Sequence, residues 1–134
     1  MTRMLHSVEV KDYMSASLVH LTPETDVLRA IHLLLENNVS GAPVTDKLGN
    51  VVGFLSEKDC LQVAMDAGYH EEWGGNVSEY MTPEVITVDA DASILDVARI
   101  FRNTSFKSLP VMDDNRLAGQ ITRSDVLRAF QEIR

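Results

Sequence analysis

The sequence contains the stretch Gly119-Gln120-Ile121-Thr122-Arg123-Ser124-Asp125, which reads as the end of a β-strand followed at once by the start of a helix. A hydroxyl residue with an acid three positions later is the pattern that caps a helix N-terminus. An earlier copy, Gly53-Phe54-Leu55-Ser56-Glu57-Lys58-Asp59, precedes it by 66 positions. Two copies of Gly-x-x-Ser/Thr-x-x-Asp in a chain of 134 residues indicate a duplicated unit.

The composition is that of a globular protein, because 45% of the 134 residues are hydrophobic. The net charge of -8 argues against a general nucleic-acid binder, since phosphate backbones are bound by basic faces. Cys60 is the only cysteine, which excludes an intrachain disulfide and a cysteine zinc cluster. No apolar run approaches the ~20 residues that span a bilayer, and the first residues lack the apolar core of a signal peptide. We therefore expect a cytoplasmic protein that binds neither membranes nor nucleic acid.

The repeat extends to both sides of these copies. Residues 10–15 (Val-Lys-Asp-Tyr-Met-Ser) match residues 77–82 (Val-Ser-Glu-Tyr-Met-Thr) at an offset of 67. Short β-prone runs at residues 18–21 and 85–88 predict strands. A helix with one apolar face is predicted next in each copy. The first is expected to begin at Thr22-Pro23-Glu24 and to end at Asn37-Asn38, and the second to run from Asp89 to about Asn103-Thr104.

A hairpin follows in each copy, with strands at residues 42–45 and 51–55 and at residues 109–112 and 116–121. Pro43 and Pro110 indicate strand starts or edges, because proline cannot donate to a ladder. The helix after each hairpin begins at the Ser/Thr-x-x-Asp pattern, and Gly68 is expected to end the first of these helices. Each half therefore reads β-α-β-β-α and predicts an α/β (α+β) fold.

The predicted boundaries are a lead-in and first repeat at residues 1–68, a linker at 69–76 and a second repeat at 77–134. A half of about 60 residues is only marginally stable alone. We therefore expect the two repeats to pack about a pseudo-twofold axis, and the remaining apolar helix faces to form a homodimer.

The repeated pattern resembles a tandem pair of CBS domains, as in stand-alone CBS domain-containing proteins of the bacterial type. The resemblance covers about Val10 to Phe130 and rests on features that occur twice in the same order. They are Tyr-Met-Ser/Thr at residues 13 and 80, the capped first helix, Ala/Leu-Pro-Val at residues 42 and 109, and Gly-x-x-Ser/Thr-x-x-Asp. It implies a regulatory protein without catalysis or a catalytic cofactor. Its clefts between the repeats would bind AMP, ADP, ATP or S-adenosyl methionine, and it would act on an unidentified partner protein.

A helix start has a physical basis for such a site. A carboxylate in the first turn accepts hydrogen bonds from ribose hydroxyls, and the N–H groups and dipole of the helix favour phosphate. By the resemblance, Asp125 would hold the ribose, while Thr122 and Arg123 would face phosphate. The second cleft would use Val19, Val39, Ser40, Lys107, Gln120, Thr122, Arg123, Ser124 and Asp125. The first cleft would use Phe54, Ser56, Lys58, Asp59, Ile86 and Phe106, again with Lys107 beside the phosphates.

The second cleft ranks first as a phosphate site. Arg123 offers a bidentate contact to phosphate, whereas Glu57 at the equivalent position of the first cleft repels it.

Other interpretations of the same residues stay open. The Ser/Thr-x-x-Asp pattern is also a plain helix cap, which would make the chain a ligand-free dimerisation scaffold. A metal ion or a different anion is a third possible occupant of the clefts. The four histidines have no metal-ligand spacing, and Cys60 reads as a small core residue. Neither a nucleophile–base pair nor a P-loop is present, so the sequence predicts no enzyme.

Overall fold

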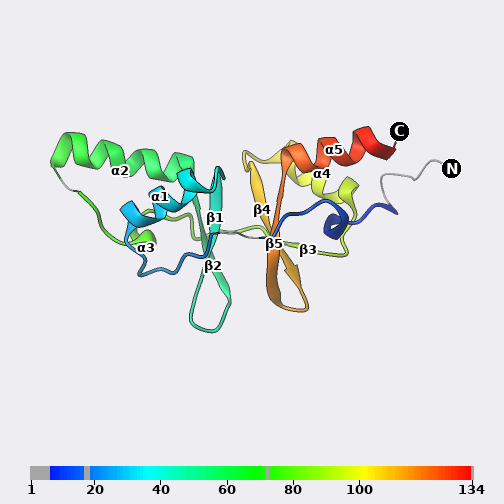
Figure 1. The fold of residues 1–134 in the computed structure, drawn as a ribbon, viewed down its shortest axis with the longest axis horizontal. Coiled ribbons are helices and arrows are strands. Elements are labelled where there is room, and N and C mark those ends of the chain that lie inside the picture. The colour runs from blue at the N-terminus through cyan, green and yellow to red at the C-terminus, as the bar shows by residue number, and fades with distance from the viewer. Residues whose placement is uncertain (1–6, 17–18, 72, 134) are drawn as a thin grey trace. The chain divides into compact units, whose positions relative to one another are not determined.

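The computed structural model describes residues 7–16, 19–71 and 73–133. The chain divides into two compact units, and Figure 1 labels their helices and strands. Unit 2 comprises residues 18–85, and unit 1 comprises the residues before and after that range. The mixture of helices and small sheets confirms the predicted α/β class. The packing of the repeats about a pseudo-twofold axis stays a prediction.

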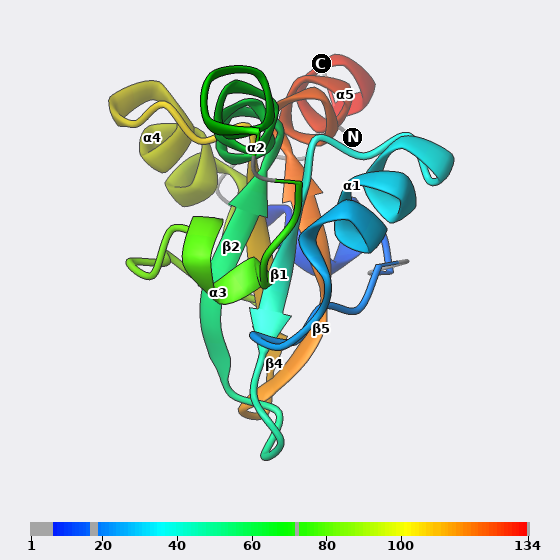
Figure 2. The ribbon, with the colours of Figure 1, turned by 90° about the vertical axis from the view of Figure 1, so that its left-hand side faces the viewer.

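Unit 2 contains a two-stranded antiparallel sheet with three helices. Its elements are α1 (Val27–Glu36), β1 (Gly41–Thr45), β2 (Val51–Ser56), α2 (Glu57–His70) and α3 (Val77–Tyr80). Leu21 adds a single parallel bridge to Val44 of β1. Figure 2 shows β1 and β2 side by side, joined by the long turn at one end of the hairpin. The core of unit 2 forms where α1 packs on this sheet, with Leu21, Leu34 and Leu55 almost completely buried.

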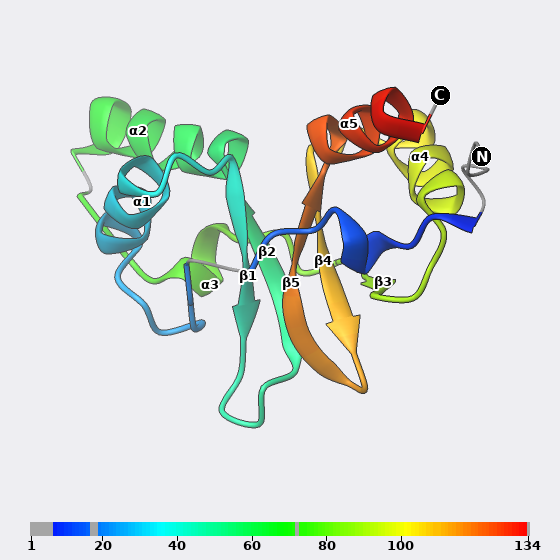
Figure 3. The same cartoon turned by 45° about the vertical axis from the view of Figure 1, so that its right-hand side comes forward.

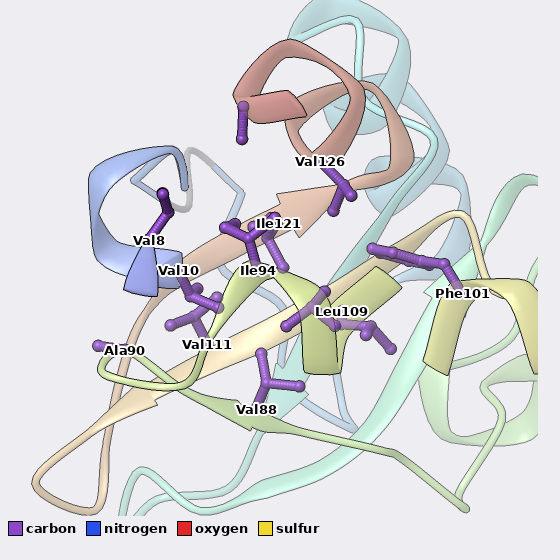
Figure 4. Packing of buried hydrophobic residues seen from close by; sticks show 12 residues of the cluster. Val8, Val10, Val88, Ala90, Ile94, Phe101, Leu109, Val111, Ile121 and Val126 are labelled. Atoms are coloured by element: carbon purple, nitrogen blue, oxygen red, sulfur yellow. The ribbon is translucent and has the colours of Figure 1, made fainter. Parts of the chain in front are cut away.

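Unit 1 contains a three-stranded sheet in the order β3-β4-β5. Its elements are a 3-10 helix (Val10–Asp12), β3 (Val88–Asp89), α4 (Ile94–Asn103), β4 (Ser108–Asp113), β5 (Arg116–Thr122) and α5 (Arg123–Ile133). β3 pairs with β4 in parallel and β4 pairs with β5 antiparallel (Figure 3). Val8 and Val10 from the start of the chain are fully buried in this core, beside Val111 and Ile94 (Figure 4).

The segment that leads into each repeat packs on the sheet of the other repeat. In unit 1, Ser15 and Gln120 exchange two backbone hydrogen bonds of 2.9 Å. In unit 2, Thr82 and Phe54 make the same pair of bonds, also at 2.9 Å. The compact units therefore differ from the spans of the sequence repeat, because residues 7–16 belong to unit 1 and residues 77–85 belong to unit 2. The boundaries 1–68, 69–76 and 77–134 stay a prediction about the repeat itself.

This pairing explains why proline is tolerated inside two strands. Pro43 and Pro110 occupy the third position of β1 and β4, not the strand start. They lie opposite Phe54 and Gln120, whose backbone N–H and C=O groups both bond to a lead segment. The missing proline donor therefore removes no hydrogen bond from the hairpin.

The predicted starts of the two first helices are wrong. α1 begins at Val27, because the Thr22–Thr25 segment closes a turn of its own and Asp26 caps the helix by accepting a 3.0 Å bond from the Leu28 N–H. α4 begins at Ile94, where Ser93 caps the Asp96 N–H at 3.1 Å, so the predicted start at Asp89 is also wrong. In both copies the residues that resemble a helix start lie in a turn that precedes the helix.

The other predicted helix and strand boundaries are partly wrong and partly confirmed. Gly68 does not end α2, which continues to His70 and ends at Glu71 in the left-handed conformation. The predicted strand at 85–88 is reduced to Val88–Asp89, and the run at 18–21 is reduced to the bridge of Leu21; Leu18 lies outside the described residues. The ends predicted at Asn37 and at Asn103-Thr104 are confirmed. Among the described residues, none of the helices has the length and apolarity needed to cross a membrane.

Candidate functional site

The start of α5 is closed by reciprocal hydrogen bonds between Thr122 and Asp125. The Asp125 N–H donates to Thr122 Oγ1 at 3.1 Å, and the Thr122 N–H donates to Asp125 Oδ2 at 2.9 Å. Asp125 is only 6% exposed, and its Oδ1 pairs with the Arg128 guanidinium at 3.1 Å. Because a carboxylate has about four lone-pair sites, Oδ1 keeps acceptor capacity after this ion pair.

The start of α2 repeats the arrangement. The Asp59 N–H donates to Ser56 Oγ at 3.1 Å, and the Ser56 N–H donates to Asp59 Oδ2 at 3.0 Å. The Thr82 hydroxyl donates to the same carboxylate, 3.3 Å from each oxygen. Both Ser/Thr-x-x-Asp copies are therefore true capping boxes, as the plain capping interpretation predicted.

The glycine of each motif makes room for the lead segment. A Cβ atom at Gly119 would overlap the backbone carbonyl of Ser15, and one at Gly53 would overlap the Met81 sulfur. The Tyr-Met-Ser/Thr and Gly-x-x-Ser/Thr-x-x-Asp motifs, separate in sequence, are thus parts of one structural feature. The contact of Thr82 with the Asp59 carboxylate was not predicted from the sequence, although Thr82 belongs to the repeated Tyr-Met-Ser/Thr motif.

Arg123 and Lys107 both lie at the start of α5. The Arg123 guanidinium donates to the carbonyls of Phe106 at 2.8 Å and Thr104 at 3.2 Å. The Arg123 N–H reaches the Lys107 carbonyl at 3.3 Å, and both side chains are exposed. Two exposed cations beside a helix N-terminus give unit 1 an anion-attracting surface.

The remaining predicted residues divide between the units. Unit 1 also holds Gln120, Ser124, Ile86 and Phe106; Gln120 is buried and its Nε2 donates to Ser108 Oγ at 2.9 Å. Unit 2 holds Val19, Val39, Ser40, Phe54, Ser56, Lys58 and Asp59. Within unit 2 the Ser40 carbonyl accepts the Glu57 N–H at 2.9 Å, which sets Ser40 at the start of α2. Both predicted clefts draw residues from the two units, so their assembly stays a prediction.

A polar pocket of about 510 Å³ opens beside Asp59 in unit 2. Its lining contains more acids than bases: Lys58, Asp59, Gln62, Asp66, Glu79 and Tyr80. The Gln62 amide and the Tyr80 hydroxyl donate to the Asp66 carboxylate and hold the pKa of Asp66 below its usual value. This side of unit 2 therefore suits a neutral or cationic group better than a phosphate.

Cys60 lies one position after Asp59, on the inner side of α2. Burial, with the nearby carboxylates of Asp59 and Glu57, raises the pKa of the Cys60 thiol to about 11. A thiol with such a pKa is a poor nucleophile at neutral pH. This agrees with the interpretation of Cys60 as a packing residue and gives it no catalytic part.

Metal ligation finds no support in the part of the chain that the structure describes. No group of three or more His, Cys, Asp or Glu side chains is placed there to hold an ion. What the two helix starts offer is a carboxylate acceptor, oriented N–H groups and, in unit 1, guanidinium and ammonium donors. These groups bind polar ligands; they do not form a nucleophile–base pair.

The fold and the paired helix starts define a class of α/β protein built from a tandem repeat, in which a capped helix follows each hairpin. A family model for the CBS domain matches the chain twice, at residues 10–66 and 77–132. The chain belongs to the CBS domain family as a tandem pair, which confirms the resemblance inferred from the motifs.

Relatives support the same assignment. A CBS domain-containing protein of Dictyostelium discoideum is 32% identical over 130 residues, covering 90% of this chain and 89% of its own. The chloroplastic protein CBSX2 of Arabidopsis thaliana is 30% identical, covering 93% of this chain and 64% of its own. An uncharacterised protein of Methanocaldococcus jannaschii, MJ1225, is 29% identical over 89% of this chain. The chain spans 41% of MJ1225, so it corresponds to only part of some curated relatives.

Two solved structures with bound ligands share the fold. CBSX2 in complex with AMP matches with a TM-score of 0.81 and 34% identity, covering 94% of this chain and 98% of the other. The CBS domain pair of protein MJ0100, in complex with 5-methylthioadenosine and S-adenosyl-L-methionine, matches with a TM-score of 0.79 and 26% identity, covering 95% and 98%.

Proposed function

We propose that this protein is a regulatory module that binds an adenosine-containing nucleotide (AMP, ADP, ATP or S-adenosyl methionine) in clefts between its two repeats. The observation that carries the proposal is the buried, anchored Asp125 carboxylate at the start of α5, next to the exposed cations Arg123 and Lys107. Two structural neighbours that bind AMP or adenosine-derived sulfur compounds support it.

Asp125 accepts the ribose hydroxyls in this proposal, and Arg123, Lys107 and the α5 N–H groups bind phosphate. Gln120, Thr122 and Ser124 complete the unit 1 side, with Val19, Val39 and Ser40 supplied by unit 2. The other site, the first cleft, is centred on Asp59 with Phe54, Ser56, Lys58, Ile86 and Phe106. Because acids outnumber bases beside Asp59, phosphate-rich nucleotides prefer the Asp125 site.

The module has no catalytic role in this proposal, and it acts as a homodimer on a separate protein. Ligand binding controls such a partner only if the nucleotide binds one arrangement of the module more tightly than another.

Isothermal titration of the wild-type protein and of Asp125→Ala with each of the four ligands tests the proposal. The Asp96→Ala variant is the matched control, because Asp96 occupies the same position after its capping serine in α4, outside the site. Saturable binding should persist in Asp96→Ala and weaken at least tenfold in Asp125→Ala, since a ribose–carboxylate contact is a charge-assisted hydrogen bond worth about 1.5–3 kcal/mol. Absence of saturable heat for all four ligands would favour the ligand-free scaffold.

A further inference from the structure

The Arg128 side chain of α5 connects the candidate site of unit 1 to the start of the chain. Its Nη1 pairs with Asp125 Oδ1 at 3.1 Å, one helical turn earlier. Its Nη2 donates to the backbone carbonyl of Tyr13 at 3.2 Å, and the guanidinium lies 5.7 Å from the centre of the Tyr13 ring, within cation–π range. A planar guanidinium presents several N–H donors in a fixed fork, so one side chain holds both acceptors at once.

The Tyr13 end of this bridge lies in the lead segment of unit 1, residues 10–16. Ser15 of the same segment exchanges the paired 2.9 Å backbone bonds with Gln120 of β5. Figure 3 shows the segment in blue beside β5. The chain then continues directly into unit 2, which begins at residue 18. The guanidinium of Arg128 therefore joins the candidate ribose carboxylate to the stretch of chain that leads into unit 2.

The Asp125 end of the bridge is a nearly buried carboxylate that has to be held. Its side chain is only 9% exposed, and a carboxylate removed from water is costly unless it is paired and hydrogen-bonded. The Thr122 N–H fixes Oδ2, and Arg128 fixes Oδ1. Oδ1 is the oxygen with acceptor capacity left for a ligand. Without the guanidinium this oxygen would lose the partner that keeps it in place for ribose hydroxyls.

Unit 2 holds its own carboxylate differently. The position of α2 that corresponds to Arg128, 66 residues earlier, is Gln62, whose amide donates to Asp66. The Tyr80 hydroxyl donates to that same carboxylate, and Asp59 accepts instead from the Thr82 hydroxyl. The capping box of α2 thus forms with glutamine at the position that holds arginine in α5. The fold alone therefore does not require an arginine bridge after a capping box.

We propose that Arg128 is a positioning residue for the nucleotide site and couples ligand binding at Asp125 to the docking of the lead segment. It holds Oδ1 for the ribose, while the Tyr13 carbonyl and ring hold the guanidinium. Docking of the segment and binding of the ligand then strengthen each other, because coupling between two binding events is reciprocal. The inference rests on the proposed nucleotide site and adds the residue through which binding reaches the chain that enters unit 2.

Isothermal titration with AMP tests the positioning role. Arg128→Gln gives α5 the residue that α2 has at this position, and it should raise the AMP dissociation constant about fivefold or more, as loss of a typical coupling does. Arg128→Lys keeps the charge beside Asp125 but not the planar fork, so its constant should lie between those of the wild type and Arg128→Gln. Arg99→Gln is the matched control, because Arg99 pairs with Asp96 at 3.2 Å with the same spacing in α4, outside the site. It should leave the constant unchanged.

Amide hydrogen exchange of the same proteins tests the coupling, which a purely structural role of Arg128 would not produce. The Ser15 N–H donates to the Gln120 carbonyl, so its exchange reports docking of the lead segment. The Val97 amide of α4, in the core of unit 1, serves as the reference for unfolding of the whole unit. Saturating AMP should slow exchange at Ser15 relative to Val97 by about fivefold or more in the wild type. This extra slowing should be lost in Arg128→Gln and in Arg128→Lys.

The outcomes separate this inference from the nucleotide proposal. Equal AMP dissociation constants for the wild type and Arg128→Gln, or equal slowing at Ser15 in both, would overturn the positioning role while nucleotide binding stands. Arg128→Lys is the milder change and carries the comparison if Arg128→Gln does not fold; a lysine variant that matches the wild type in both measurements would overturn the bridge. Absence of saturable AMP binding to the wild type would instead refute the proposed function, and this inference with it.

Discussion

Gly119→Ala should destabilise the protein by about 3 kcal/mol, because its new methyl group meets the backbone of the lead segment. The added Cβ overlaps the Ser15 carbonyl, which takes part in the paired 2.9 Å hydrogen bonds with Gln120. Overpacking costs about 1–3 kcal/mol, and each backbone hydrogen bond that is strained contributes about 1 kcal/mol more. Gly53→Ala should cost only about 1 kcal/mol, since the overlap there is with the Met81 side chain, whose thioether is flexible.

The control is Gly68→Ala, at a helical glycine with no neighbour within 4 Å of the new Cβ. It should stabilise the protein by about 0.5–1 kcal/mol, because alanine is the better helix former. Urea unfolding followed by circular dichroism measures all three variants. A Gly119→Ala protein within about 0.5 kcal/mol of wild type would refute the pairing of the lead segment with β5.

Three further predictions concern titratable groups. Asp125→Ala should cost about 2 kcal/mol of stability because it removes a buried capping carboxylate and an ion pair, whereas Asp96→Ala, which loses only the exposed ion pair with Arg99, should cost about 0.5 kcal/mol; chemical denaturation compares them. Cys60, with its pKa raised to about 11, should react slowly with iodoacetamide at neutral pH and about tenfold faster per pH unit until the thiolate forms; a plateau near neutrality would contradict this. Gln62→Leu removes the main cause of the lowered pKa of Asp66, so this pKa should rise in an NMR titration. In the wild-type protein the lowered pKa of Asp66 contributes folding stability at pH values above the pKa of the unfolded chain, and this contribution is lost as the pH falls through the folded-state pKa. The variant should therefore lose less stability on acidification, and an unchanged pKa of Asp66 would refute the assignment.

Local patterns predicted most of the fold. The hairpins, the helix after each hairpin and the apolar faces follow from alternation, helical periodicity and capping within short windows. The packing of each lead segment on the sheet of the other repeat could not be predicted in this way, since Ser15 and Gln120 are distant in sequence and no local signal joins them. The starts of α1 and α4 were misplaced because a Thr-Pro or Asp signal resembles a cap even where a turn intervenes.

The candidate site was predicted at the level of single elements. Thr122 and Asp125, like Ser56 and Asp59, lie three positions apart, so their reciprocal bonds follow from spacing alone. The hydrogen bond from Thr82 to the Asp59 carboxylate depends on the packing of the second lead segment against β2 and was therefore not predicted. The grouping of residues from both repeats around one ligand is a further step, which only a ligand-binding measurement tests.

The most direct such measurement is a ¹⁵N–¹H NMR titration of the wild-type protein with AMP. The account predicts saturable shifts of the amide signals of residues 119–125, while residues 93–96 at the start of α4, which carry the same capping pattern away from the site, stay unchanged. Signals that do not move at saturating AMP, or that move equally at both helix starts, would contradict nucleotide binding at Asp125.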